Sequence, residues 1–261
     1  MKVRPAAVAG SFYPADPHRL EAEVRSHLAA ADPPLDVRPK ALVAPHAGYI
    51  YSGPVAGSAF RQLEPWRGAI DRVVLLGPSH FVPFAGLALP STRAFATPLG
   101  DVPIASDAAN RLADLPQVVV ADRPHSREHA LEVELPFLQV ALGRFELVPL
   151  AVGDAEPEDV AEVLDRLWGG EETLIVVSTD LSHYHGYATA AARDRATADA
   201  IVALDMERIA ADDACGWNPL RGLLLAARRC GLVVTELDLR SSGDTVGGRD
   251  QVVGYGAFAL A

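Results

Sequence analysis

Three short apolar runs in the sequence are each followed, within a few residues, by a histidine. The pairs are ALVA with His46, VVLL with His80 and LIVV with His183. Neutral imidazole is a common ligand for iron, copper, nickel and zinc. If the runs are neighbouring parallel strands, the histidines meet beyond the carboxyl ends of the sheet, where open α/β folds bind their ligands. The pattern therefore favours a transition-metal site, and the alternative is that each imidazole only satisfies a hydrogen bond in its loop.

Cys215 stands just before an expected helix start at Asn218-Pro219. The positive end of a helix dipole favours the thiolate over the thiol, and a thiolate is a good ligand for a divalent transition metal. Cys215 is therefore a candidate ligand, and the alternative is a small buried hydrophobic residue. The second cysteine, Cys230, falls in the last turn of the same helix and is expected to pack inside the protein.

The stretch HSREHALEVELPFLQ carries two carboxylates four positions apart, Glu128 and Glu132, with His129 beside the first. Residues four apart share a face of a helix. This face is expected to supply an acid/base group or a group that supports the metal ligands, or else to be solvated. The remaining histidines are interpreted as surface or solvated residues: His18, His27, His125 and His185.

The overall composition restricts the class of protein and of partner. A formal charge of -11 at pH 7 argues against a nucleic-acid partner, which usually requires a basic face, but it does not exclude a small anionic substrate in a local pocket. Of the 261 residues, 49% are hydrophobic, 22% are charged and two are cysteines. This balance indicates a soluble globular protein with a substantial core, not a disulfide scaffold, and it favours a reducing cytoplasm.

Targeting segments and several enzyme motifs are not found. The first residues, MKVRPAAVAGSFYPADP, contain no apolar region of useful length for a signal peptide, and no apolar run approaches the roughly 20 residues that cross a bilayer. The sequence contains no G-x-S-x-G, Walker loop, G-x-G-x-x-G, C-x-x-C or H-E-x-x-H motif. We therefore expect a cytoplasmic protein without a membrane or nucleic-acid partner, whose chemistry depends on residues that meet only in the fold.

Proline and glycine mark the ends of four expected helices. Asp16-Pro17 opens the first, whose apolar stripe should end before Pro33-Pro34. The starts of the other three are Gly53-Pro54, Pro157 and Asn218-Pro219. Gly231 should close the last of them as a left-handed cap. A further leucine stripe runs over 131–142 and should be kinked or broken at Pro136.

Runs rich in Val, Ile and Leu separate these helices and have the length of strands: 41–44, 73–76, 147–152, 174–177 and 233–239. Near-continuous apolar runs that alternate with helices indicate a largely parallel sheet covered on both faces. The segment 86–104 alternates more and carries turn residues, so we expect an antiparallel hairpin, or a pair of strands, added to that sheet. No repeat or long linker divides the chain, which favours a single α/β domain over 1–261, with a mixed, largely parallel sheet flanked by helices.

Several motifs, taken together, resemble the Memo family. They are RPAAVAGSFYPADP, APHAGYIYSGPVAGSAF, LLGPSHFVPFAGLAL, FATPLGDVPI, EHALEVELPFLQ, STDLSHY, ACGWNP and SSGDTVGGRDQVVGYGAFAL, in the expected order over nearly the whole chain. The resemblance implies one domain with a fold similar to that of class III extradiol-type non-haem iron dioxygenases. It also implies kinship with animal proteins of cell motility signalling that bind phosphotyrosine peptides, and with prokaryotic proteins that accompany a radical-SAM protein.

The resemblance also implies a set of metal-binding residues: His46, His80 and Cys215. Asp180 and His183 match residues that line the same pocket, and His129 matches the E-H of the EHALEVELPFLQ motif. In the ring-cleaving relatives, two histidines and a carboxylate hold Fe(II) and leave positions open for substrate and oxygen. Cys215 departs from that pattern, because a thiolate favours copper or zinc more than a carboxylate would and is itself oxidisable.

Our first hypothesis is a metal-dependent redox enzyme, dioxygenase-like, whose metal is iron in the first place and otherwise copper or zinc. His183 would transfer protons and Asp180 would orient a ligand or bind substrate, and His129 completes the catalytic set. The residues expected to line the pocket or its entrance are Tyr49, Tyr51, Ser79 and Glu128. The second hypothesis is a module that binds a peptide or small acid in the same pocket without reaction, and the third is the handling of iron or copper.

Overall fold

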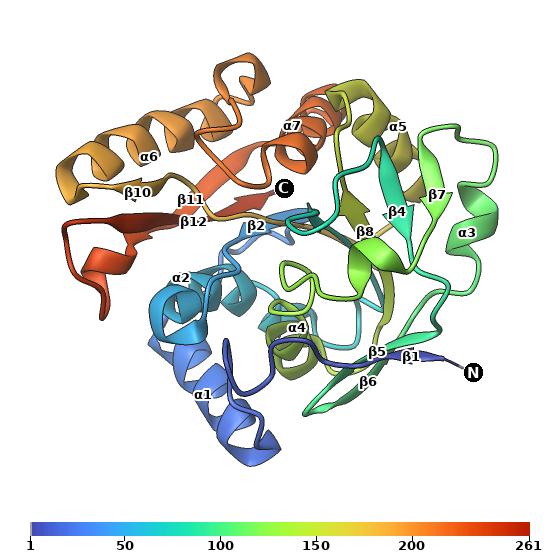
Figure 1. Cartoon of the computed structure of the whole chain (residues 1–261), viewed down its shortest axis with the longest axis horizontal. Helices are drawn as coiled ribbons and strands as arrows, with labels where there is room; N and C mark the ends of the chain where they lie inside the picture. The colour runs from blue at the N-terminus through green and yellow to red at the C-terminus, as the bar shows by residue number, and fades with distance from the viewer. Residues whose placement is uncertain (1) are drawn as a thin grey trace.

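A nine-stranded mixed sheet forms the centre of the structure, a computed structural model that describes residues 2–261. Figure 1 shows the sheet between two groups of helices. The strands, in spatial order, are β10 (His183–His185), β12 (Val252–Leu260), β2 (Ala41–Ala44), β9 (Thr173–Ser178), β3 (Arg72–Pro78), β8 (Glu146–Val152), β4 (Leu87–Leu89) and β7 (Val118–Val120), and β11 (Val234–Ser241) also pairs with β12. The expectation of an α/β fold with helices around a mixed sheet is confirmed.

The four strands in the middle of the sheet, β2, β9, β3 and β8, are mutually parallel. Their Val, Ile and Leu side chains are buried on both faces, as a parallel strand with helices on either side requires. β9 pairs with β2 on one side and with β3 on the other. The three strands that carry a histidine beyond their ends are therefore immediate neighbours, which meets the condition on which the predicted convergence of the histidines depends.

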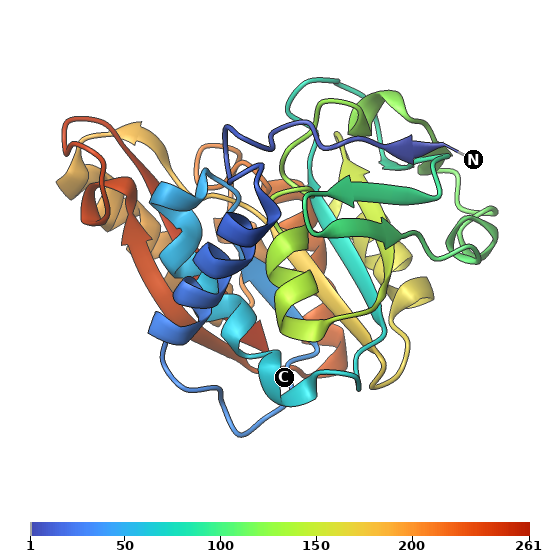
Figure 2. The same cartoon turned by 90° about the horizontal axis from the view of Figure 1, so that it is seen from below.

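Successive strand residues point to opposite faces, and each face has its own helices. Leu42 and Ala44 belong to the hydrophobic core under α1 (Pro17–Ala30), α2 (Tyr49–Arg61) and α4 (Leu135–Leu142). Ala41 and Val43 belong to the core under α5 (Pro157–Leu167), α6 (Tyr187–Val202), α7 (Trp217–Cys230) and the short α3 (Ala108–Arg111). Figure 2 shows the first group of helices in front of the sheet.

Several pairings toward the edges of the sheet are antiparallel, although β7 pairs parallel to β4, so the sheet is less parallel than expected. β12 runs antiparallel to β2 and to both β10 and β11, and β4 runs antiparallel to β8. The predicted addition over 86–104 is wrong in part, because only β4 joins this sheet. The hairpin of β5 (Ala94–Thr97) and β6 (Gly100–Pro103) instead forms a three-stranded sheet with β1 (Val3–Arg4).

Several helix ends follow the sequence signals. Asp16 caps α1 by accepting a hydrogen bond from the Arg19 backbone N–H, and α5 begins at Pro157. Gly231 ends α7 with a left-handed backbone at φ 71°. The start expected at Gly53-Pro54 is wrong, because α2 already begins at Tyr49 and contains Pro54. The backbone N–H groups of residues 51 and 52 bond to the Gly48 carbonyl, which starts this helix earlier.

The acidic stretch before α4 is not helical. α4 begins only at Leu135, with Pro136 in its first turn, and residues 126–134 form bends and turns. The prediction that Glu128 and Glu132 share a helix face is therefore wrong. Both side chains are buried, at 1% and 0% exposure, and neither is solvated.

The other short helices are η1 (Glu64–Trp66), η2 (Arg123–His125), η3 (Met206–Arg208) and η4 (Ser242–Asp244). Across residues 2–261, no helix combines the length and the apolar composition that crossing a bilayer requires.

Candidate metal centre

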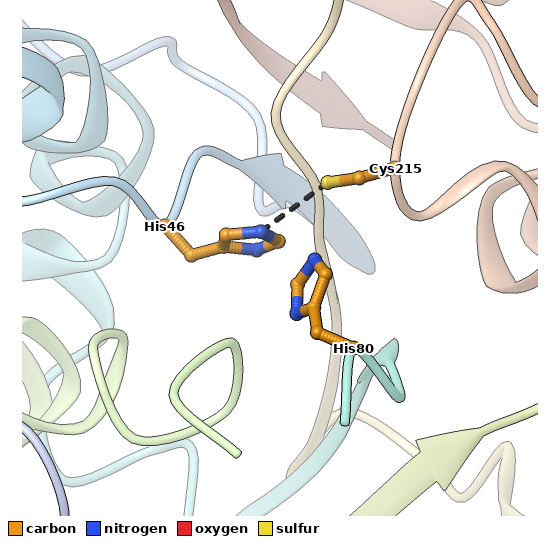
Figure 3. A group of neighbouring side chains, drawn as sticks. All are labelled: His46, His80 and Cys215. Carbon is orange, nitrogen blue, oxygen red and sulfur yellow. Dashed lines mark hydrogen bonds between the residues drawn. The ribbon is translucent and has the colours of Figure 1, made fainter. Parts of the chain in front are cut away.

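Three side chains from distant parts of the chain meet beyond the carboxyl ends of the central strands. His46 follows β2, His80 follows β3, and Cys215 precedes α7. Nε2 of His46 and Sγ of Cys215 are 3.3 Å apart, and one ligand atom from each of the three residues lies within 4.8 Å of the others. Figure 3 shows the two rings and the sulfur directed toward one another. Ligands around a tetrahedral metal are typically about 3.3–3.8 Å apart, so this group could hold a metal ion.

The ring of His46 is buried and oriented by Ser178, the last residue of β9. Nδ1 of His46 lies 2.7 Å from Oγ of Ser178, which also lies 2.7 Å from both the Ala130 carbonyl and Oε1 of Glu134. The Ser178 hydroxyl can donate its one proton to the Ala130 carbonyl or to Oε1 of Glu134, whose pKa burial raises well above its usual range. With that proton directed to either oxygen, Ser178 accepts from Nδ1–H of His46. The lone pair of Nε2 is left facing Cys215.

His80 is oriented by a buried carboxylate. One oxygen of Glu128 accepts the His80 backbone N–H at 2.7 Å, and the other lies 2.9 Å from Nδ1 of His80. Burial alone would raise the pKa of Glu128, but the hydrogen bonds from His80 and from the backbone N–H of Ala130 lower it overall. Glu128 is therefore ionised and accepts the Nδ1 proton. Nε2 of His80 is thus the ring nitrogen that remains for a ligand, an arrangement common behind metal-binding histidines.

Asp180 joins the loops of His46 and Cys215. Its Oδ1 accepts the His46 backbone N–H at 2.8 Å, and its own backbone N–H donates to the sulfur of Cys215 at 3.3 Å. The Cys215 backbone N–H in turn donates to the Asp180 carbonyl at 3.2 Å. Asp180 is 5% exposed, and this burial raises its pKa to about 7. Asp180 therefore holds the backbone on both sides of the site.

The sulfur of Cys215 does not have the ionisation that its position before a helix suggested. Burial, followed by the charge of Asp180, raises the pKa of the Cys215 thiol to about 12, although backbone hydrogen bonds act in the opposite direction. This raised pKa favours the thiol over the thiolate that the position before α7 suggested. A metal would have to replace its proton. The expectation that Cys230 packs inside is also wrong, because Cys230 is exposed.

A cavity of about 1110 Å³ opens beside the three-residue group. His129 and His183 line it, together with Asp180 and Tyr51. The His129 ring stacks on His80, with centroids 4.8 Å apart. Nδ1 of His183 donates to the Leu181 carbonyl at 2.7 Å, so its Nε2 is free. The structure therefore brings every histidine and the aspartate of the predicted site to one cavity.

Three residues predicted to line the pocket lie elsewhere. Tyr49 is 1% exposed and belongs to the core, where its hydroxyl donates to the Val133 carbonyl. Ser79 bonds to the Val82 carbonyl and lines a different hollow. Glu128 lies behind His80, outside the cavity lining. Tyr49 was misplaced because it begins α2 with its ring toward α4, where it packs on Phe137.

Two further expectations about side chains need correction. His125 is not solvated, because its ring is 1% exposed and Nε2 donates to the Ala88 carbonyl. His27 is only partly exposed and packs beside Tyr49. Sequence reasoning also missed the roles of Ser178 and Glu134. The only signal was that Ser178 is the polar residue at which the apolar run of β9 ends.

The donor set fits a first-row transition metal. Burial, followed by the neighbouring His80, lowers the pKa of His46 well below its usual range, so the His46 imidazole is neutral. Two nitrogen lone pairs and one sulfur therefore converge, with the second ring nitrogen of each ligand already bonded to the protein. Such mixed nitrogen and sulfur donors suit iron, copper or zinc, not magnesium or calcium.

Comparison with known proteins gives the family. The family model described as "Memo-like protein" matches residues 4–259. A MEMO1 family protein of Methanopyrus kandleri is 38% identical over 98% of both chains, and one of Sulfolobus acidocaldarius is 34% identical over 97% of both. A third, from Aquifex aeolicus, is 34% identical over 98% of both chains. With the match extending over almost its whole length, the chain belongs to the Memo family.

Proposed function

We propose that this chain is a metal-dependent redox enzyme that acts on a small polar molecule in the cavity beside His46. One observation carries the proposal: two free imidazole nitrogens and a sulfur converge at the wall of a cavity of about 1110 Å³. That volume is far more than an ion needs and lies slightly above the usual range of about 300–1,000 Å³ for small-molecule sites.

His46, His80 and Cys215 would hold the metal, with iron as the first expectation and copper or zinc as the alternatives. Such a metal, when bound, supplies an open coordination position and, for iron or copper, one-electron chemistry with dioxygen as the oxidant. Two of the three donors are fixed before any ion arrives. Ser178 holds the His46 ring at 2.7 Å and Glu128 holds the His80 ring at 2.9 Å.

His183 and His129 would manage protons in the cavity. Burial lowers the pKa of both rings, so each is a neutral base at pH 7. His183 keeps its Nδ1 proton on the Leu181 carbonyl and can accept a substrate proton only at Nε2. Asp180 would fix the position of the loops that carry His46 and Cys215 through its hydrogen bonds to both residues. It also lines the cavity, where it could contact a substrate.

A second candidate is a module that binds a peptide or small acid in this cavity without reaction. Ile50, Tyr51 and Tyr184 line the cavity and are 61%, 39% and 70% exposed. Large apolar side chains that remain this exposed around a polar cavity are typical of a recognition surface. This reading needs no turnover, and the metal would then have a structural role or none.

Metal analysis combined with turnover separates the two candidates. The protein would be purified anaerobically, loaded with Fe(II), Cu(I) or Zn(II), and analysed for each element beside the variants His46→Ala and His80→Ala. We expect one metal per chain in the parent protein and a large loss in both variants, together with metal-dependent oxygen consumption on at least one phenol or small acid. Absence of bound metal would overturn the proposal. Stable metal without oxygen consumption would support the binding module.

A further inference from the structure

The side chain of Arg4, near the start of the sequence, contacts the segment 126–134 that supports the candidate metal centre. Arg4 lies on β1 and is 4% exposed. Its Nε donates to the His125 carbonyl at 2.8 Å, one terminal nitrogen donates to the Glu128 carbonyl, and the other pairs with the Glu132 carboxylate. The five N–H donors of a guanidinium lie in a rigid plane, so one side chain can hold three acceptors in fixed relative positions.

The segment that Arg4 holds has no regular structure of its own. Among the described residues, 126–134 belong to no helix or strand, since η2 ends at His125 and α4 begins at Leu135. A turn segment of this kind is normally the mobile part of a fold, because few backbone hydrogen bonds fix it. Arg4 bonds to two residues of this segment, Glu128 and Glu132, and to the carbonyl of His125 just before it.

The same segment carries the groups that orient the two candidate histidine ligands. The Glu128 carboxylate holds both the backbone N–H and the ring of His80, and the Glu134 carboxyl holds Ser178, which bonds to His46. Arg4 bonds directly to the main chain of Glu128. A displacement of that carbonyl would therefore move the carboxylate on which the His80 ring depends.

The buried charge of Arg4 is fully compensated. Glu132 is 0% exposed and, besides Arg4, accepts the backbone N–H groups of Ala7 at 2.7 Å and Val8 at 3.0 Å and the hydroxyl of Tyr13 at 2.5 Å. A buried ion pair persists only when its remaining hydrogen-bonding positions are satisfied. Glu132 thus ties the N-terminal segment 4–13 to the turn segment on one side, while Arg4 reaches Glu128 on the other.

We propose that Arg4 is a positioning residue of the metal centre, which presets His80 through the main chain of Glu128. The inference rests on the proposed function, since it assumes that His80 is a ligand. It gives strand β1 a role in metal affinity, although β1 lies far from the candidate ligands along the sequence. Removing an outer group behind a metal-bound histidine typically lowers metal affinity by about 10–100-fold.

The test compares Co(II) affinity in the full chain, measured by competition with a chelator and by the thiolate-to-cobalt absorption band. Arg4→Lys keeps the charge beside Glu132 but cannot also reach the Glu128 and His125 carbonyls, and we expect about tenfold weaker Co(II) binding. Tyr13→Phe is the matched control, because it removes a bond to Oε1 of the same Glu132, whereas Arg4 pairs with Oε2. It should lower the Tm while leaving the affinity unchanged within about twofold.

A double variant decides whether Arg4 acts through Glu128. Glu128→Gln alone should weaken Co(II) binding, and adding Arg4→Lys should weaken it little further, because residues on one path are not additive. Equal affinity of Arg4→Lys and the parent protein, or fully additive losses in the double variant, would overturn the inference. If Arg4→Lys fails to fold, Glu132→Asp displaces the same guanidinium with its charge partner kept. A parent protein that shows no cobalt band at all would instead refute the proposed function.

Discussion

Nε2 of His46 and Sγ of Cys215 lie 3.3 Å apart, although 169 positions separate the two residues in the sequence. The two atoms are within hydrogen-bonding distance, and each residue also bonds to a further group of the protein. Ser178 holds the far side of the imidazole, and the Asp180 backbone N–H donates to the sulfur. In the proposed metal site, this pair would form one half of the ligand set, with both atoms already in position.

Replacing the sulfur tests this half directly. Cys215→Ser should abolish the thiolate-to-cobalt absorption band and weaken Co(II) binding by more than about 100-fold, because even outer groups behind a ligand are worth about 10–100-fold. Cys230→Ser is the matched control, since the second cysteine is exposed at the end of α7. Chelator competition on both variants gives the affinities. Parent-like binding by Cys215→Ser would remove the sulfur from the site.

Ser178→Ala tests the support behind His46. The variant removes the acceptor of Nδ1–H and frees the buried carboxyl of Glu134, so we expect about 10–100-fold weaker Co(II) binding and a loss of about 1–3 kcal/mol in unfolding free energy.

Ser58→Ala provides a control for the loss of a buried hydroxyl as such. Ser58 lies on α2 and bonds to Asp238 and to the Pro54 carbonyl, away from the metal centre. Urea unfolding and cobalt titration of both variants separate stability from affinity. Equal Co(II) affinities of Ser178→Ala and Ser58→Ala would show that His46 keeps its orientation without Ser178.

Gly216→Ala tests the close approach of the Cys215 loop to the end of β9. A Cβ at position 216 would lie 2.7 Å from Cβ of Thr179 and 2.9 Å from the Ser178 carbonyl, so the loop would have to move away. We expect both a lower Tm and weaker Co(II) binding. Gly248→Ala is the control, because a Cβ there meets nothing within 4 Å although the residue lines the same cavity. Identical cobalt affinities in the two variants would contradict the close contact.

The convergence at the strand ends could be predicted from the sequence because its causes are local. Runs of Val, Ile and Leu specify buried parallel strands, and each run that ends before His46, His80 or His183 places a ring at the same edge. The order β2-β9-β3, which makes these strands neighbours, is a tertiary property. No periodicity in the sequence encodes it.

The supports behind the ligands could not be predicted in the same way. Arg4 meets Glu132 across 128 positions and His46 meets Ser178 across 132, so neither pair has a local pattern. Helix α6 was missed because its sequence, YATAAARDRATADAIV, carries alanine and charge in place of a leucine stripe. Strand β12 was missed because its two glycines weaken the strand signal.

His125 provides a test that does not depend on any metal. Its ring is 1% exposed, Nε2 donates to the Ala88 carbonyl at 2.9 Å, and the buried Nδ1 has no hydrogen-bond partner among residues 2–261. Burial lowers the pKa of His125 to about 4; the hydrogen bond to the Ala88 carbonyl opposes this, the charge of Arg4 adds to it, and Asp122 and Glu128 oppose it more weakly. Protonation would place an N–H at Nδ1, where the described residues offer no acceptor.

The sign of the pH dependence follows from comparing the two states. Above about pH 6.5, the ordinary pKa of histidine, His125 is neutral in both the folded and the unfolded chain, and its contribution to stability is constant. As the pH falls from about 6.5 toward about 4, only the unfolded chain takes up the proton, so the unfolding free energy decreases. At about 1.4 kcal/mol per pH unit, the loss over this interval amounts to about 3 kcal/mol.

His125→Gln should remove this part of the pH dependence, because its side-chain amide can still donate to the Ala88 carbonyl but does not titrate. Urea unfolding of both proteins at pH values between about 7.5 and 4.5 gives the two stability curves. The other histidines with lowered pKa values are present in both proteins, so the difference between the curves isolates His125. We expect the stability of the parent protein relative to the variant to decrease as the pH falls. Curves that stay parallel would mean that the folded protein accommodates the His125 proton, and that the unpartnered Nδ1 has an acceptor after all.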